Sequence, residues 1–91
     1  MALDWDPLKA ETNFKKHGIR FSETEPVFED DAAITIADDE SDPSERRFIT
    51  IGAGAKGTLL VVVYCYRGED IRLISARVAE PRERRQYEEI R

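Results

Sequence analysis

The sequence predicts an α+β fold in which a small, mainly antiparallel four-stranded sheet is packed by two N-terminal helices and one C-terminal helix. Helix signals lie before residue 30 and after residue 79, and strand-like runs fill residues 32–79. The connections between these runs are short, which favours antiparallel neighbours. A chain of 91 residues is long enough for one core, so we expect a single domain over residues 1–91.

Two helices are expected before the sheet. Asp6-Pro7 places a capping acid before a proline in the first helical turn, and Gly18 is a stop signal, which predicts a helix over residues 7–17. Ser22-Glu23-Thr24-Glu25 has the pattern of a capping box and predicts a short second helix. Pro26 weakens that helix unless it falls in the first turn.

Strand patterns fill the middle of the chain. Apolar and polar residues alternate in three of the runs, whereas Thr58–Tyr66 is apolar on both faces, as a central strand should be. The acidic turn Asp38–Pro43 and the turn at Gly68 separate neighbouring strands. The expected strands and the helix that follows them are Ala32–Ala37, Arg46–Ile51, Thr58–Tyr66, Asp70–Ala79 and Glu80–Arg91.

The net charge of −5 is unevenly distributed along the chain. Residues 22–45 hold ten acidic side chains and no basic one, whereas residues 46–91 hold ten basic and six acidic ones. A basic face built from the second half of the chain and Lys15-Lys16 is therefore compatible with the acidic total. On charge alone, a solvated mixed surface is the simpler interpretation.

The first residues lack a secretory signal, and no run approaches the roughly 20 apolar residues of a membrane span, so we expect a cytoplasmic protein that does not contact membranes. Cys65 is the only cysteine and ends the apolar run Leu59–Cys65. We therefore expect Cys65 to be a small core residue rather than a catalytic thiol.

Three patterns resemble motifs for cofactor or metal binding, but each lacks a residue or element that the motif requires. Gly52–Gly57 matches a dinucleotide fingerprint, but a β-branched strand follows where a helix is required, so the glycines indicate a hairpin loop. The acidic turn Asp38–Pro43 lacks the glycine and the glutamate of a calcium loop. With one histidine and one cysteine, a zinc site of ordinary ligands is not expected. We expect no cofactor, and a magnesium site in the acidic turn is a weak alternative.

Arginines are frequent after residue 45, and the last expected strand carries two. Strict alternation puts Arg72 on the face of Ile74 and Arg77 on the face of Ser75, so that one arginine interrupts an apolar face. Guanidinium groups are poor core residues, so each needs an acidic partner or an anionic ligand. The acidic partners considered for such salt bridges are Glu45, Glu69 and Glu80.

Two further side chains have both a structural and a functional interpretation. His17 is the only histidine, the residue type used most often for proton transfer near neutral pH, but a histidine at the end of a helix also suits the helix dipole. Tyr87 shares one side of the last helix with Glu83 and Ile90, which suits packing against the sheet.

Motifs along the whole chain occur in the order and at the spacing of a known family. They are Trp5-Asp6-Pro7 with Lys9-Ala10, Asn13 with Lys16-His17-Gly18 and Phe21, Val27-Phe28 with Asp30, Glu45-Arg46, Ile51-Gly52, Leu59–Tyr64, Ile71–Arg77, and Glu83-Arg84 with Tyr87. The chain at these residues resembles the BrnT toxins. This ordered set is far more specific than any single motif above.

The resemblance implies a compact ribonuclease fold similar to the RelE-type toxins and membership of a type II toxin–antitoxin pair. It further implies inhibition by a BrnA-like antitoxin that bears a ribbon-helix-helix DNA-binding segment. Operator DNA would be bound only through that antitoxin, in a hetero-oligomer that we expect to be a dimer of toxin–antitoxin dimers.

RNA carries its own nucleophile, the 2′-hydroxyl, so a metal-independent endoribonuclease needs only a base, an acid and cations at the phosphate. Arg77 and Arg67 are assigned to the phosphate, and His17 to proton transfer. Glu45 is a general base or merely the partner of Arg46, and Tyr87 stacks on a nucleobase or donates a proton. The candidate catalytic residues are His17, Arg67, Arg77, Glu45 and Tyr87, and the candidate substrate-binding residues are Lys16, Arg46, Arg72 and Arg84.

An alternative function is a non-catalytic module that holds a DNA-binding partner in an autorepressor complex. The acidic stretch 22–45 repels RNA and is better suited to contact a basic segment of a partner or to remain solvated.

Overall fold

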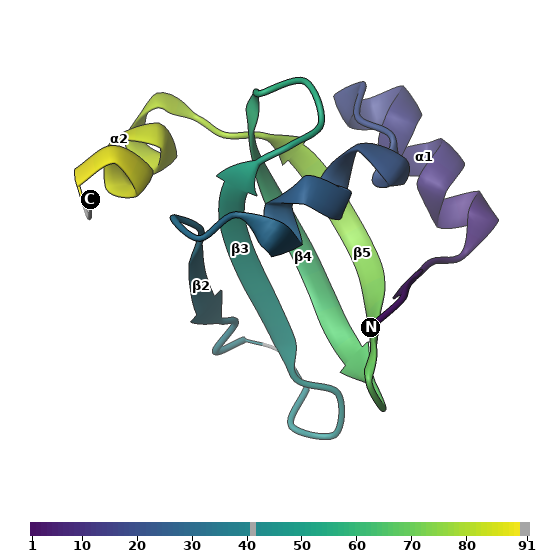
Figure 1. Cartoon of the computed structure of the whole chain (residues 1–91). Coiled ribbons are helices and arrows are strands. Elements are labelled where there is room, and N and C mark those ends of the chain that lie inside the picture. Colours follow the sequence, from purple (N-terminus) through teal and green to yellow (C-terminus); the bar gives the residue numbers. More distant parts are fainter. Residues whose placement is uncertain (41, 90–91) are drawn as a thin grey trace.

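The computed structural model describes residues 1–40 and 42–89, which form a curved five-stranded sheet with helices near both ends of the chain (Figure 1). The elements in chain order are β1 (Leu3–Asp4), α1 (Pro7–His17), the 3-10 helix η1 (Phe21–Glu29), β2 (Ile34–Ala37), β3 (Arg47–Ala53), β4 (Leu59–Arg67), β5 (Asp70–Val78) and α2 (Pro81–Glu89). The end of the last expected helix, Ile90-Arg91, and Ser41 of the acidic turn lie outside the described residues.

The sheet order is β1-β5-β4-β3-β2. All neighbours are antiparallel except β1, which runs parallel to β5. The expected central position of Thr58–Tyr66 is confirmed by β4, but the expected number of four strands was wrong. Leu3 pairs with Ile71, whose N–H donates to the carbonyl of Ala2 at 2.9 Å. A two-residue strand shows no periodicity, so the sequence could not signal it.

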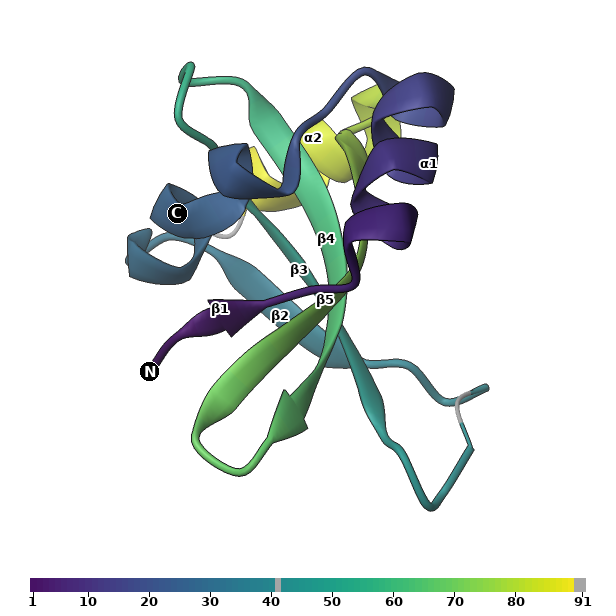
Figure 2. The same ribbon diagram turned by 90° about the vertical axis from the view of Figure 1, so that its right-hand side faces the viewer.

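Helix α1 begins and ends where the sequence predicts. The Asp6 carboxylate accepts a hydrogen bond from the N–H of Leu8 at 2.9 Å, and Pro7 is the first helical residue. Gly18 ends the helix with φ of 73°, a left-handed conformation that costs little without a Cβ, and its N–H donates to the carbonyl of Phe14. Figure 2 shows α1 lying beside β5.

The second helix is present, but its start differs from the expectation. η1 begins at Phe21, and the Glu23 carboxylate accepts a hydrogen bond from the N–H of Arg20 at 2.7 Å. The predicted capping box over residues 22–25 was therefore wrong by two residues, because the observed one runs from Arg20 to Glu23. Pro26 lies inside η1 and lacks a backbone donor, and the segment takes the tighter 3-10 form.

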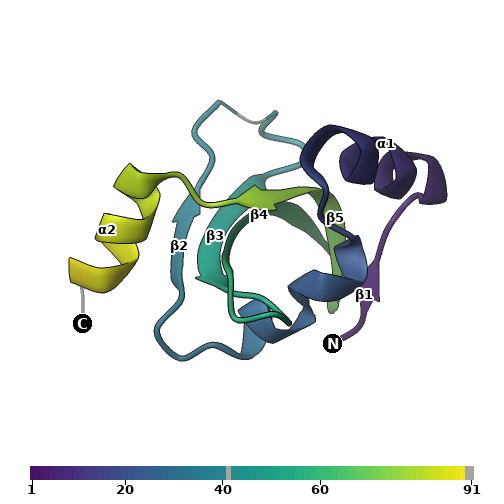
Figure 3. The ribbon, with the colours of Figure 1, turned by 90° about the horizontal axis from the view of Figure 1, so that it is seen from above.

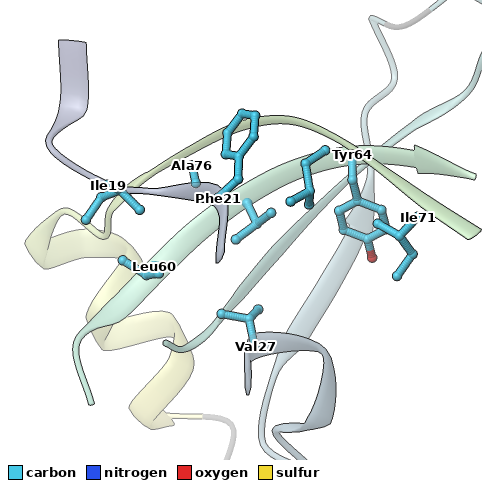
Figure 4. Close-up of a cluster of buried hydrophobic side chains, with 9 residues drawn as sticks. Ile19, Phe21, Val27, Leu60, Tyr64, Ile71 and Ala76 are labelled. Carbon is cyan, nitrogen blue, oxygen red and sulfur yellow. The ribbon is translucent and has the colours of Figure 1, made fainter. Parts of the chain in front are cut away.

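The sheet curls around η1, and the face toward η1, the inner face, carries the larger core (Figure 3). In β3, Gly52 permits this close packing, because a Cβ there would lie 3.0 Å from the side chain of Val27. The buried residues of this core are Ile19, Phe21, Val27, Leu60, Val62, Tyr64, Ile71, Leu73 and Ala76 (Figure 4).

The opposite, outer face carries a smaller core under α2. Tyr87 packs there with Ile51, Val61 and Ala79. The strands β3 and β4 form a hairpin, so a strand and not a phosphate-binding helix follows the glycines of residues 52–57, as expected. Gly54 and Gly57 lie in the turn, but the expectation that all three glycines belong to the loop was wrong, because Gly52 pairs with Leu60 inside β3. No helix within the described residues is long and apolar enough to span a membrane.

Candidate active site

Strand β5 presents three polar side chains on the outer face because a bulge interrupts its alternation. The register with β4 shifts at Ile74, which has no partner across the sheet. One extra residue moves the residues that follow it to the opposite face, so Arg72, Ser75 and Arg77 all lie on the outer face. The expectation that one of the two arginines interrupts an apolar face was therefore wrong. The inner face of β5 carries Ile71, Leu73, Ala76 and Val78.

Asn13 fixes α1 against the edge of β5. Its amide nitrogen donates to the carbonyls of Ile19 and Ala76 at 3.0 and 2.9 Å, and its amide oxygen accepts the N–H of Ala76 at 3.0 Å. The buried side chain thus satisfies both backbone groups of Ala76, as a neighbouring strand would. The position of the next turn of α1 relative to β5 follows from this anchor.

That anchor leaves a groove of about 350 Å³ between α1 and the bulged part of β5. His17 is half-buried in the groove wall, and Lys16 beside it is exposed. Ser75 lines the facing side. The remaining residues of the wall are Leu8, Lys9, Thr12, Asn13 and Ile74. The groove therefore holds the only histidine of the chain next to a lysine and a hydroxyl group.

Arg77 lies two residues beyond Ser75 and is held by the start of α2. Its two terminal nitrogens donate to the two carboxylate oxygens of Glu83, each at 2.8 Å. This hydrogen bonding raises the pKa of Arg77 and lowers the pKa of Glu83. Glu83 binds the edge of the guanidinium that Nη1 and Nη2 form. The neighbouring, side-on edge presents two further donors, the Nε–H and the second hydrogen of Nη2. Those two donors match two oxygens of a phosphate.

A second group of charges lies at the far end of the same face. Arg67 forms an ion pair with Glu45 at 3.2 Å, and Arg72 with Asp4 at 2.7 Å. Glu45 also accepts a hydrogen bond from the Cys65 thiol, and this bond and that from Arg67 lower the pKa of Glu45. The hydrogen bond from Arg72 likewise lowers the pKa of Asp4.

These two groups do not form one compact site. Arg72 and Arg77 are five residues apart on a strand, or about 16 Å at the usual rise per residue. The structure brings Lys16, His17 and Ser75 together, with Arg77 nearby on the same face, and separates them from Arg67 and Glu45.

Comparison with known proteins decides the family. The family model for the ribonuclease toxin BrnT of type II toxin–antitoxin systems matches residues 5–83. The chain belongs to the BrnT family. The resemblance inferred from the sequence motifs is thereby confirmed, and the protein is a toxin of a type II toxin–antitoxin system.

The BrnT fold is also supported by a solved structure. The 1.1 Å crystal structure of the ribonuclease toxin BrnT from Brucella abortus superimposes with a TM-score of 0.68 at 26% sequence identity. The match covers 88% of this chain and 97% of that one. None of the curated proteins matches the sequence.

Three further candidate residues of this BrnT toxin do not line the groove between α1 and β5. Tyr87 is 7% exposed, and its hydroxyl donates to the Asp30 carboxylate at 2.7 Å, which anchors α2 to the loop after η1. Arg84 is exposed on α2, and Arg46 is exposed just before β3. Glu45 pairs with Arg67 and not with Arg46, the partner named from the sequence.

Sequence reasoning missed two acidic partners. Glu83 and not Glu80 holds Arg77, and Asp4 holds Arg72. A signal for Glu83 was present, because it lies three residues after Glu80 at a helix start and accepts the N–H of Glu80 at 2.9 Å, as in a capping box. No local signal marks Asp4, which reaches Arg72 through the β1–β5 pairing. Within residues 1–40 and 42–89, no three His, Cys, Asp or Glu side chains form a group that could hold a metal ion.

Proposed function

We propose that this toxin is a metal-independent endoribonuclease whose cleavage site is the groove between α1 and β5. The observation that carries the proposal is the groove itself, in which Ser75 faces Lys16 and His17, with Arg77 two residues further along on the same face of β5. A proton-transfer group, a positioning cation and a planar guanidinium are thereby available to one phosphodiester.

The reaction follows from the chemistry of RNA. The 2′-hydroxyl attacks the adjacent phosphorus, its proton passes to a base, and the 5′-oxygen of the next nucleotide leaves after receiving a proton. His17 is the proton-transfer group, and Lys16 holds the phosphate. Arg77 stabilises the charge that develops on the phosphate oxygens through its side-on edge. The products are a 2′,3′-cyclic phosphate, hydrolysed in turn to a 3′-phosphate, and a 5′-hydroxyl.

The remaining basic residues bind RNA away from the reacting phosphate. Arg72 and Arg67 lie on the same face at its far end and are suited to flanking phosphates, after exchange with Asp4 and Glu45. Glu45 is a poor general base, because the hydrogen bonds from Cys65 and Arg67 lower its pKa. Its part in the mechanism is to hold Arg67.

In this proposal the antitoxin binds the same outer face at its other edge, over β2 and β3. There, a groove of about 240 Å³ is lined by Gln86 and four isoleucines, of which Ile36 is 58% exposed. The acidic turn after β2 lies beside it. This combination fits an amphipathic, basic segment of a BrnA-like antitoxin, whose ribbon-helix-helix part would bind operator DNA. The expected assembly contains two toxins and two antitoxins. The isoleucines are Ile34, Ile36, Ile49 and Ile51.

The test is cleavage of RNA by the purified toxin in excess chelator, followed by analysis of the product ends. We expect undiminished cleavage and products ending in cyclic or 3′-phosphate. Products ending in 3′-hydroxyl, or activity restored only by magnesium, would reject the mechanism.

A second candidate is the non-catalytic module that holds a DNA-binding partner. One observation favours it, because Arg67, Arg72 and Arg77 each form an ion pair with a carboxylate. Inducing the chain without its antitoxin separates the two functions. A ribonuclease arrests growth and degrades RNA, whereas a binding module does neither.

A further inference from the structure

A second cavity lies on the other side of α1, between this helix and the start of η1. Its volume is about 300 Å³. Its wall includes three aromatic side chains, Trp5, Phe14 and Phe21, together with the polar side chains of Glu11, Arg20 and Ser22. None of these residues has a part in the cleavage groove.

Trp5 and Phe14 are the aromatic side chains of this wall that are accessible, whereas Phe21 is buried in the core. Trp5 and Phe21 meet edge to face, with ring centroids 5.9 Å apart and planes at 69°. The Arg20 guanidinium lies 4.2 Å above the ring centroid of Phe14. Phe14 is 39% exposed, so its ring is not needed to fill the core. A guanidinium stacked on an aromatic ring is a surface on which a nucleobase can stack.

The polar side chains of the wall supply both kinds of hydrogen-bonding group. Arg20 has donors only, and Glu11 has acceptors only. Glu11 is also kept in place by Lys15, whose ammonium lies 3.0 Å from its carboxylate. The edge of a nucleobase displays donors and acceptors side by side, and its faces stack on aromatic rings. The cavity therefore offers hydrogen-bonding groups for the edge of a nucleobase and aromatic rings for its faces.

The position of the cavity connects it to the cleavage groove. Phe14 and His17 are three residues apart on α1, so their Cβ atoms are neighbours, about 5–6 Å apart, on the helix surface. A base in the cavity would therefore bring the sugar and phosphate of its own nucleotide toward the Lys16-His17 end of α1.

We propose that this cavity binds one unpaired nucleobase of the RNA, adjacent to the phosphate that is cleaved. The proposal rests on the proposed ribonuclease function, because it assigns the base to the same substrate. It predicts that cleavage is confined to single-stranded RNA, since a paired base is not available to stack on Phe14 and Trp5.

Trp5 is the only tryptophan of the chain, so its fluorescence reports occupancy of the cavity directly. The probe is a short 2′-O-methyl RNA oligonucleotide, which has no free 2′-hydroxyl and is not cleaved. The control probe has the same length and backbone but abasic sugars. We expect saturable quenching by the first oligonucleotide and none by the abasic one. Equal quenching by both would overturn the proposal.

A variant pair makes the test specific to the ring of Phe14. Phe14→Leu keeps an apolar side chain but removes the stacking surface, and we expect about 10-fold weaker binding of the base-bearing oligonucleotide. Tyr66→Leu removes another exposed aromatic ring, at the far end of β4, and should bind as the parent does. Unchanged binding by folded Phe14→Leu protein, with antitoxin binding intact, would overturn the proposal.

The outcomes separate this inference from the proposed function. Base-dependent quenching in a chain that does not cleave RNA would support the cavity and refute the ribonuclease. Cleavage by Phe14→Leu at the parent rate, without base-dependent quenching in the parent, would keep the ribonuclease and refute the cavity. Quenching by antitoxin instead of by oligonucleotide would show that the cavity is a protein-binding surface.

Discussion

The β5 side of the sheet and its β2 side differ in charge, packing and exposed chemistry. On the β5 side, α1 covers the strand edge and contributes Lys16 and His17, and the strand itself carries Arg72 and Arg77. On the β2 side, the edge strand has one strand neighbour, four isoleucines, of which Ile36 is exposed, line a groove, and an acidic turn follows. One side is suited to a polyanion and the other to a basic, apolar protein segment.

This difference shows why the net charge of −5 is a poor guide to the ligand. The acidic residues are concentrated between residues 22 and 45, in η1, the acidic turn and the segments beside them, whereas β5 carries Arg72 and Arg77. Surface charges separated by more than about 10 Å are largely screened at ordinary salt concentration. Each side therefore acts on its ligand mainly through its own charges, and the comparison can be tested one side at a time.

The largest effect is expected at Arg77. Arg77→Ala should lower the cleavage rate about 10²–10³-fold, if the guanidinium stabilises developing charge as an oxyanion donor does. Arg77→Lys should retain part of the activity, because lysine keeps the charge but loses the planar fork. The measurement is single-turnover cleavage by purified protein, with Arg85→Ala, an exposed arginine of α2, as the control.

Parent-like cleavage by folded Arg77→Ala protein that still binds antitoxin would remove Arg77 from the site. A lower melting temperature with unchanged cleavage per molecule would mean that the Arg77–Glu83 ion pair only stabilises the fold.

His17 should have the next largest effect. His17→Gln should lower the cleavage rate about 10²-fold, the usual contribution of a positioned proton-transfer group. Histidine is the side chain that titrates between about pH 5 and 8, so the pH dependence of kcat/KM in that range should flatten in the variant. A pH profile of unchanged shape would leave His17 as a helix cap.

On the β2 side, neutralising the acidic turn should slow association with the antitoxin. The triple variant Asp38→Asn, Asp39→Asn, Asp42→Asn removes three charges and keeps one side-chain acceptor oxygen at each position. The association rate at low salt should fall about 10-fold, and its dependence on salt should weaken. RNA cleavage should be unchanged. Association that does not depend on salt in the parent would place the antitoxin elsewhere.

The smallest effect is expected at Tyr87, which belongs to neither side. Tyr87→Phe removes the hydrogen bond to Asp30 and should lower the free energy of unfolding by about 1–2 kcal/mol, while cleavage per folded molecule stays at the parent level. Denaturant unfolding and cleavage assays on the same protein measure both quantities. A large loss of cleavage with unchanged stability would return Tyr87 to the catalytic residues.

Much of the fold could be predicted because its signals are local. Asp6, Pro7 and Gly18 defined α1 correctly at both ends, since capping depends on neighbouring backbone groups. The apolar run of β4 indicated a central strand because both of its faces are covered. The family followed from residues spread over the chain, and the family model confirms it.

Less of the candidate site could be predicted. Alternation in β5 gave the wrong face for Arg72 because the bulge at Ile74 depends on the register with β4. Glu45 was assigned to its sequence neighbour, whereas the sheet brings it to Arg67 from the end of β4. The isoleucine groove was not foreseen, since it forms only where β2, β3 and α2 meet.

The sequence by itself determined both ends of α1, the order of the apolar runs that form strands, the charge asymmetry and the family, because each depends on neighbouring residues or on their spacing. Only the tertiary structure decided the pairing of β1 with β5, the common face of Arg72, Ser75 and Arg77, and the carboxylate that holds each arginine. The physical reason is that strand register and side-chain pairing join residues far apart in the chain, and a shift of one residue in register reverses the face on which a side chain lies.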